Sequence, residues 1–298
     1  MFWLSHISKK KMIISELNGG LGNQLFQFAI ARNLSIKLNI PFKLDASIYN
    51  NNKVRQYNLD VFGCKNSLAD KTDISFFFPN RAKGIARILQ TLKNKYYRPV
   101  VIEEQNFKFN ADVLGYTNNN IYLKGYWQSE KYFNDIRLIL LNDLKITMPL
   151  KKSNEVLLEK IQSKKSVALH IRRGDYVSNK TVANYHGTCS LDYYYNAINY
   201  IAQSNEEIVI YVFSDDIDWV KANLKTKHTI CYVENNMNYE DLRLMSSCHH
   251  NIIANSSFSW WGAWLNQSSG KVVIAPKNWF INTEINTIDL LPETWIKL

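Results

Sequence analysis

The sequence predicts an α/β fold with two halves, each built from strands that alternate with helices. Three observations support this prediction. The chain has 298 residues, of which 46% are hydrophobic, which is enough to bury one large core or two medium-sized ones. Short apolar segments with strand character recur between amphipathic segments throughout the chain. No apolar run approaches the roughly 18 residues that a membrane span needs. The sequence therefore describes a globular chain with parallel strands.

The first half begins with a buried strand at residues 12–18 and a tight turn at Gly19–Gly22, followed by a helix at residues 23–38. Residues 1–11 are expected to form an extension outside the fold, because Met12 begins the first clear strand. Their apolar part precedes their basic part, which is the reverse of a signal peptide. Residues 48–98 have no regular pattern. The other expected elements of this half are strands at 42–44, 100–103 and 121–124 and a helix at 131–144.

The second half has the more regular pattern. Its expected strands are 167–171, 208–213, 229–233, 251–254 and 271–274, and its expected helices are 191–203, 217–224, 239–247 and 258–266. Short apolar strands separated by helices predict a parallel, doubly wound sheet. We expect domains at residues 12–150 and 151–298, with a ligand between them at the carboxyl ends of the strands.

The net charge of +10, from 36 basic and 26 acidic residues, favours an anionic partner or a merely solvated basic surface. The anionic partner could be a nucleic acid, a phosphorylated small molecule or an anionic membrane surface. The chain has no basic and aromatic module such as an RNP motif, which argues against nucleic acid. None of the four cysteines stands at C-x-x-C spacing, so neither a zinc ribbon nor a redox motif is predicted.

The first segment with chemical potential is Gly19-Gly20-Leu21-Gly22-Asn23-Gln24. Glycines let a backbone approach a ligand closely, and the amino terminus of the following helix favours an anion. The segment matches neither the G-x-G-x-x-G dinucleotide pattern nor a P-loop. The alternative is a strand-to-helix turn that binds nothing.

The second segment is His170-Ile171-Arg172-Arg173-Gly174-Asp175-Tyr176, at the end of an expected strand. Adjacent arginines at a strand's carboxyl end suit a phosphate or diphosphate, because guanidinium binds phosphate oxygens bidentately and stays charged. His170 is either a core histidine or a ligand contact. Asp175 either takes part in the chemistry or holds the arginine pair in position.

The third segment is Ser214-Asp215-Asp216-Ile217-Asp218, which follows the expected strand at 208–213. Three roles fit it. Its side chains could cap the next helix, a carboxylate could accept hydrogen bonds from a nucleobase edge, or Asp216 and Asp218 could bind a divalent cation as a D-x-D motif.

The fourth segment runs from Asn255 to Trp264 and reads Asn-Ser-Ser-Phe-Ser-Trp-Trp-Gly-Ala-Trp. Hydroxyls at a helix start can cap the helix or bind phosphate oxygens. At least two of the three tryptophans are expected to be core residues. Together, the four segments describe a nucleotide diphosphate site.

These four segments, in this order and spacing, resemble the α-1,2-fucosyltransferases of glycosyltransferase family 11 across nearly the whole chain from Met12 onward. The resemblance implies a GT-B-like fold, with two Rossmann-like domains facing across a cleft. It also implies GDP-β-L-fucose as donor, the 2-hydroxyl of a galactoside as acceptor, inversion to an α-1,2 linkage, and no cofactor or essential metal. The alternative is a GT-B transferase with a different nucleotide sugar.

The resemblance also assigns roles to residues. It assigns the donor β-phosphate to Arg172, with Arg173 as a supporting charge, and makes Asp175 the nearest carboxylate for a catalytic role. The carboxyl-terminal domain is the donor side and the amino-terminal domain the acceptor side. The candidates for donor binding are Gly20, Gly22, Asn23, His170, Arg173, Asp215, Asp216, Ser256, Ser257 and Phe258.

Animal members of the family carry an amino-terminal membrane anchor, and we expect none in this protein. The resemblance therefore implies a bacterial type of enzyme that is cytoplasmic, with peripheral association with the inner face of the membrane as an option. Such an enzyme decorates precursors of surface polysaccharide or lipopolysaccharide.

Overall fold

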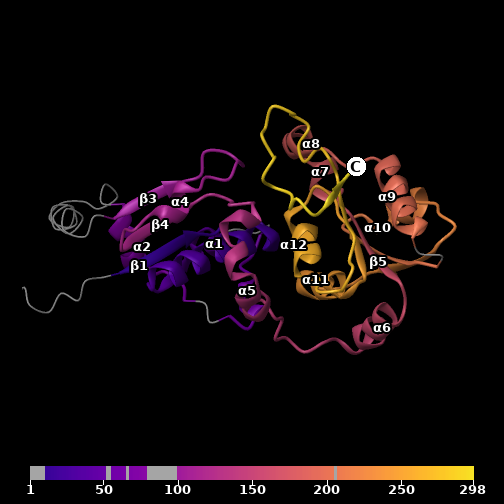
Figure 1. Ribbon diagram of the computed structural model, residues 1–298, viewed down its shortest axis with the longest axis horizontal. Helices are drawn as coiled ribbons and strands as arrows, with labels where there is room; N and C mark the ends of the chain where they lie inside the picture. The colour runs from indigo at the N-terminus through magenta and orange to yellow at the C-terminus, as the bar shows by residue number, and fades with distance from the viewer. Residues whose placement is uncertain (1–10, 52–54, 65–66, 79–98, 205–206) are drawn as a thin grey trace, which may run out of the picture. The chain divides into compact units, whose positions relative to one another are not determined.

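The computed structural model describes residues 11–51, 55–64, 67–78, 99–204 and 207–298 (Figure 1). The extension expected at residues 1–11 therefore lies almost wholly outside the described residues. The chain divides into two compact units, Met1–Lys145 and Ile146–Leu298, and each is described by itself. None of the helices within the described ranges is long and apolar enough to cross a membrane.

Unit 1 contains a four-stranded sheet with the order β2-β1-β4-β3, in which every pair of neighbouring strands is parallel. Its strands are β1 (Met12–Glu16), β2 (Phe42–Asp45), β3 (Val100–Glu103) and β4 (Asn120–Lys124). Its helices are α1 (Leu21–Leu38), α2 (Lys71–Phe77), α4 (Asp112–Gly115) and α5 (Arg137–Asp143). Its 3-10 turns are η1 (Ser47–Asn51), η2 (Leu59–Val61), η4 (Glu130–Tyr132) and η5 (Asn134–Ile136).

Successive residues of a strand point to opposite sides of a sheet, and the sheet of unit 1 buries side chains on both faces. Met12 and Ile14 of β1 pack with Phe76 and Phe77 of α2. Helix α1 packs against β1 and β2 and is buried along most of its length. Asn39 ends α1 in the left-handed conformation with φ 53°, which asparagine tolerates better than most residues.

Unit 2 contains a six-stranded, wholly parallel sheet with the order β10-β9-β8-β5-β6-β7. Its strands are β5 (Ser166–Ile171), β6 (Val209–Ser214), β7 (Thr229–Val233), β8 (His250–Ile252), β9 (Val273–Ala275) and β10 (Ile296–Lys297). Its helices are α6 (Lys152–Ser163), α7 (Gly174–Ser178), α8 (Lys180–His186), α9 (Leu191–Gln203), α10 (Ile217–Asn223), α11 (Asn238–Ser247) and α12 (Ser257–Leu265).

Two apolar layers cover the two faces of this sheet. Val167, Leu169 and Ile171 of β5 pack with α9 and α10, whereas Ala168 packs with residues of α6 and α11. Figure 1 accordingly shows α9 and α11 on opposite sides of β5. All six residues of β5 are buried, as is typical of a central parallel strand. The prediction of an α/β fold with parallel strands is confirmed.

The structure differs from the sequence-based expectation in several regions. The helix expected at 131–144 is broken into two 3-10 turns and α5, because buried Phe133 leaves the helical conformation at φ −151° and ψ 9°. Helix α6 lies just after the expected domain boundary at residue 150, in a segment where no helix was predicted. The short helices α7 and α8 and the two-residue strand β10 were not predicted.

Candidate functional site

The candidate residues of unit 2 gather where the carboxyl ends of β5, β6 and β8 meet. Strand β5 lies between β6 and β8, and the chain winds outward in opposite directions from these central strands. Arg172 and Arg173 follow β5, Asp215 and Asp216 follow β6, and Ser256 begins the turn into α12 after β8. This reversal of strand order is the point at which open α/β sheets bind ligands.

Two carboxylates hold the Arg172 guanidinium. Its Nη2 lies 2.5 Å from Asp175 Oδ1, and its Nη1 lies 2.8 Å from Asp215 Oδ2. The guanidinium carbon lies 5.3 Å from the centre of the Tyr176 ring. The Arg172 side chain is 21% exposed, so it retains access to solvent while its orientation is fixed. A cation held in this way needs little reorganisation to meet an anion.

Arg173 is fixed by a different set of contacts. Its Nε donates to Asp216 Oδ2 at 3.0 Å, and its guanidinium carbon lies 3.7 Å from the centre of the Trp219 ring. Its main-chain N–H donates to Asp215 Oδ1 at 2.9 Å. The side chain therefore lies against helix α10, which makes Arg173 a supporting charge beside Arg172. The Trp219 contact was missed by the sequence analysis, because a tryptophan at the third helical position has no distinctive pattern.

The structure does not support the capping role considered for Asp215 and Asp216. Asp216 occupies the N-cap position of α10, but its side chain makes no capping hydrogen bond. Ser214 Oγ instead accepts a hydrogen bond from the Asp216 main-chain N–H at 3.1 Å. Both carboxylates bind the arginine pair, which is why they are not available as caps. Within the described part of the chain, no three His, Cys, Asp or Glu side chains come close enough to form a metal site.

Gly174 allows the close packing of the arginine segment on Asp215. A Cβ atom at this position would lie 2.4 Å from Asp215 Oδ2, well inside van der Waals contact. Glycine is therefore required here by a close approach rather than by backbone conformation.

His170 belongs to the core beneath the site. It is 5% exposed, and its ring centre lies 5.8 Å from that of Phe258 at the start of α12. Burial, followed by the positive charge of Arg172, lowers the pKa of His170 to about 3 against a smaller opposing effect of Asp215. The imidazole is therefore neutral at pH 7. Of the two roles considered for His170, the geometry supports the core histidine.

The turn between β8 and α12 is held by Asn255. Its Nδ2 donates to the main-chain oxygens of His186 at 2.9 Å, Gly187 at 3.2 Å and Trp279 at 3.2 Å. Ser256 occupies the N-cap position of α12, and its side chain makes no capping hydrogen bond. Ser257 and Phe258 form the first turn of this helix and are half-buried. The Ser256 hydroxyl is thus not used as a cap, and the helix terminus is not closed by its own side chain.

The aromatic residues of α12 form core packing. Trp260, Trp261 and Trp264 are at most 1% exposed, and their rings contact one another. Trp260 Nε1 also donates to the Leu290 carbonyl at 2.9 Å. The expectation that at least two of these tryptophans belong to the core is confirmed for all three.

The glycine-rich candidates form a separate group in unit 1. Gly19 has φ +83°, and Gly20 is the N-cap of α1, so the turn is shorter than expected. Gly22 lies buried inside the first helical turn rather than in the turn before it. Asn23 is half-buried, and its Oδ1 accepts a hydrogen bond from Gln128 Nε2 at 2.8 Å.

The positively charged side chain of Arg55 lies beside this turn. The guanidinium Nη1 of Arg55 lies 3.5 Å from where a Cβ atom of Gly20 would be. The first turn of α1 contains no acidic residue, so the amino terminus of the helix keeps its positive potential. Arg55 was missed by the sequence analysis, because it falls in a segment without regular pattern. The turn at the end of β1 thus has the charge that suits an anionic group.

Comparison with known proteins is consistent with this geometry. The profile of glycosyl transferase family 11 matches residues 83–297. An α-1,2-colitosyltransferase of Escherichia coli is 33% identical over 297 residues, which cover 96% of this chain and 99% of that protein. The O-antigen biosynthesis glycosyltransferase WbnK of Escherichia coli is 35% identical over 309 residues, which cover 95% and 99% of the two chains.

Solved structures support the fold. The crystal structure of POFUT1 in complex with GDP-fucose matches with a TM-score of 0.51 and 13% identity. The match covers 89% of this chain and 99% of that one. Two units with parallel sheets and this structural likeness identify a GT-B-like α/β fold. From its profile match and its nearly full-length relatives, the chain belongs to glycosyltransferase family 11.

Proposed function

We propose that this protein transfers L-fucose from GDP-β-L-fucose to the 2-hydroxyl of a galactoside, with inversion to an α-1,2 linkage. The observation that carries the proposal is the Arg172 guanidinium, held by two carboxylates at the carboxyl end of the central strand β5. The α-1,2 linkage is supported by the name of the colitosyltransferase relative, and the donor by the GDP-fucose in the related POFUT1 structure. The O-antigen relative supports a role in surface polysaccharide synthesis.

In this proposal the chemistry at Arg172 is the stabilisation of the leaving group. As the bond between fucose and the β-phosphate breaks, negative charge develops on GDP. Arg172 binds that phosphate, Arg173 adds positive charge, and the amino terminus of α12 adds main-chain N–H donors. The hydroxyls of Ser256 and Ser257 lie at the same terminus and supply further donors to phosphate oxygens.

The acidic residues around Arg172 act as positioning residues in this account. Asp175 and Asp215 each bind Arg172, and Asp216 binds Arg173. These contacts favour holding the arginine pair over the nucleobase contact considered for a carboxylate of this segment. Unit 2 is the donor side. The turn of unit 1 at Gly20 and Asn23, with Arg55 beside it, is assigned to the sugar or diphosphate of the donor.

The replacement Asp175→Asn is expected to lower both turnover and GDP affinity, each by about tenfold, because a charged hydrogen bond to Arg172 is lost and the guanidinium must be ordered on binding. Calorimetric titration of GDP and steady-state kinetics measure the two effects. Asp192→Asn is the matched control, since Asp192 is an exposed carboxylate in the first turn of α9. Unchanged GDP affinity with collapsed turnover would instead make Asp175 the catalytic base.

One observation supports GDP-colitose as a second candidate donor. The colitosyltransferase relative transfers a sugar that is chemically 3-deoxy-fucose, so the two candidate donors differ by one hydroxyl. Initial rates with GDP-fucose, GDP-colitose and GDP-mannose on lactose test the proposal. The highest kcat/KM is expected with GDP-fucose. A preference for GDP-colitose would assign the second donor, and a preference for GDP-mannose would reject both.

A further inference from the structure

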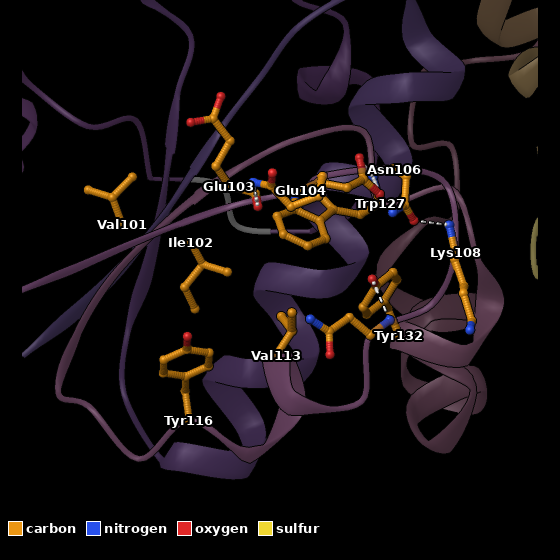
Figure 2. Close-up of a pocket in the computed structure, with 12 residues that line it drawn as sticks. Val101, Ile102, Glu103, Glu104, Asn106, Lys108, Val113, Tyr116, Trp127 and Tyr132 are labelled. Atoms are coloured by element: carbon orange, nitrogen blue, oxygen red, sulfur yellow. Dashed lines mark hydrogen bonds between the residues drawn. The ribbon is translucent and has the colours of Figure 1, made fainter. Parts of the chain in front are cut away.

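Unit 1 contains a cavity, and none of the residues discussed for donor binding contributes to its lining. It has a volume of about 370 Å³ and lies at the carboxyl end of β3, beside the turn that follows β4 (Figure 2). This volume falls within the range of about 300–1,000 Å³ that is typical of small-ligand sites. All of the residues that line the cavity belong to unit 1.

A network of short contacts shapes one wall of the cavity. The Glu104 carboxylate accepts hydrogen bonds from the main-chain N–H groups of Tyr126 at 2.7 Å and Trp127 at 3.1 Å. Gly125 allows this approach, because a Cβ atom there would lie 2.4 Å from Glu104 Cβ. Trp127 itself has φ +59°, a strained conformation for an aromatic residue. Such strain persists only where the surroundings hold it, and it is often found at ligand sites.

The floor of the cavity is apolar and aromatic. Ile102, Val113, Trp127 and Tyr132 are each at most 7% exposed, and Figure 2 shows their side chains around a common space. The Trp127 and Tyr132 rings meet edge to face, with centres 5.4 Å apart. The Trp127 Nε1 is buried and has no hydrogen-bond partner among the described residues. A buried donor without a partner is unusual, because leaving it unpaired is unfavourable.

The rim of the cavity is polar. Glu103, Gln105, Asn106, Lys108 and Asn110 line it and are exposed. Amides, a carboxylate and an ammonium group can exchange hydrogen bonds with hydroxyls in both directions. The side chains around the cavity include two carboxylates and one ammonium group, which disfavours a phosphorylated ligand. An apolar floor with a polar, nearly neutral rim is complementary to an uncharged sugar, which has C–H faces and hydroxyl edges.

Hydrogen bonds connect the wall of this cavity to the glycine-rich turn. Gln27 of α1 accepts from the Asn18 main-chain N–H at 3.0 Å and donates to the Gly125 carbonyl at 2.9 Å. Gln128, the residue after Trp127, donates to Asn23 at 2.8 Å. The turns after the neighbouring strands β1 and β4 are thereby tied together at the same edge of one sheet.

We propose that this cavity binds a neutral galactose residue of the acceptor glycan. The proposal rests on the proposed function, because a sugar acceptor is a substrate only of a glycosyltransferase. The cavity and the glycine-rich turn lie on the same sheet of unit 1. One sheet would therefore position both the acceptor sugar and the donor group assigned to the turn.

The test uses a double variant of the full-length chain, Gln105→Ala with Lys108→Ala. Both side chains are exposed on the rim, and Asn106 is kept because its Oδ1 accepts the Lys108 main-chain N–H at 2.9 Å and shapes the loop. Lactose is titrated without donor and followed by saturation-transfer NMR. We expect its affinity to fall about tenfold, since hydrogen bonds to two hydroxyls are lost. The KM for lactose should rise in parallel, with GDP affinity unchanged.

The control is Asn119→Ala, an exposed residue just before β4, at the opposite edge of the same sheet, which should bind lactose as the unchanged chain does. Undiminished lactose affinity in the double variant, or no lactose binding by the unchanged chain, overturns the proposal. Because the titration contains no donor, failure of GDP-fucose as a substrate would reject the proposed function and leave this result standing.

Discussion

Arg172→Lys is expected to lower turnover by about 10²–10³-fold, the loss typical of removing one preorganised donor from a developing oxyanion. Lysine keeps the positive charge but has no planar fork, so it cannot bind a phosphate bidentately while it also keeps the contacts with Asp175 and Asp215. Turnover with GDP-fucose and calorimetric titration of GDP measure the effect, and both should fall. The thermal unfolding temperature should stay close to that of the unchanged protein, because the side chain lies at the site and not in the core.

The control for this prediction is Arg32→Lys. Arg32 Nε is also paired with a carboxylate, Asp143 Oδ2, at 2.8 Å, but it lies in helix α1 of unit 1, outside the residues assigned to catalysis. The Arg32→Lys variant should keep the turnover of the unchanged protein. If Arg172→Lys keeps near-normal turnover and GDP affinity, Arg172 does not bind the phosphate and the assignment is wrong.

Gly174→Ala is expected to lower turnover by about 10–100-fold, although alanine adds only a methyl group. The new Cβ would lie 2.4 Å from Asp215 Oδ2, so the carboxylate must move away. That movement breaks the 2.8 Å ion pair with Arg172 and the 2.9 Å hydrogen bond from the Arg173 main chain. The loss corresponds to the net value of about one charge-assisted hydrogen bond, about 1.5–3 kcal/mol. Steady-state kinetics and GDP titration measure it.

Gly115→Ala is the matched control, because a Cβ atom at Gly115 has no neighbour within 4 Å. It should leave kinetics and thermal stability unchanged. The additional replacement Asp215→Asn in the Gly174→Ala background separates the causes. If Asp215 carries the effect of Gly174→Ala, the second replacement should add little to the loss. Independent, additive losses would contradict the proposed link between Gly174 and Arg172.

Much of the fold could be predicted from the sequence, because buried parallel strands are short apolar runs between helices. Thr229–Val233 and Leu191–Gln203 have the predicted bounds, β5 begins one residue earlier than predicted, and β6 is shifted by one residue at both ends. The exceptions have physical causes. The helix expected at 131–144 is interrupted by the buried Phe133, a tertiary contact that local pattern does not reveal. Strand β10 has two residues, too few for any periodicity.

The candidate site was predicted only at the level of residue types and strand ends. The position of Asp215 and Asp216 after β6 was compatible with a cap, a base contact or a metal ligand, and the pattern gave no sign of the ion pairs that these residues form with Arg172 and Arg173. Asn255 was included in a motif, but its hydrogen bonds to three distant carbonyls depend on the tertiary fold. The cavity beside β3 had no sequence signal, because its rim residues are ordinary loop residues.

The proposed transfer of fucose to a galactoside 2-hydroxyl is tested most directly by analysis of the product. The protein is incubated with GDP-fucose and lactose, released GDP is quantified, and the glycan product is examined by NMR. The expected product is a trisaccharide with fucose in α linkage to O2 of galactose, formed in a one-to-one ratio with GDP. A β linkage, fucose on another hydroxyl, or GDP release without any glycan product would contradict it.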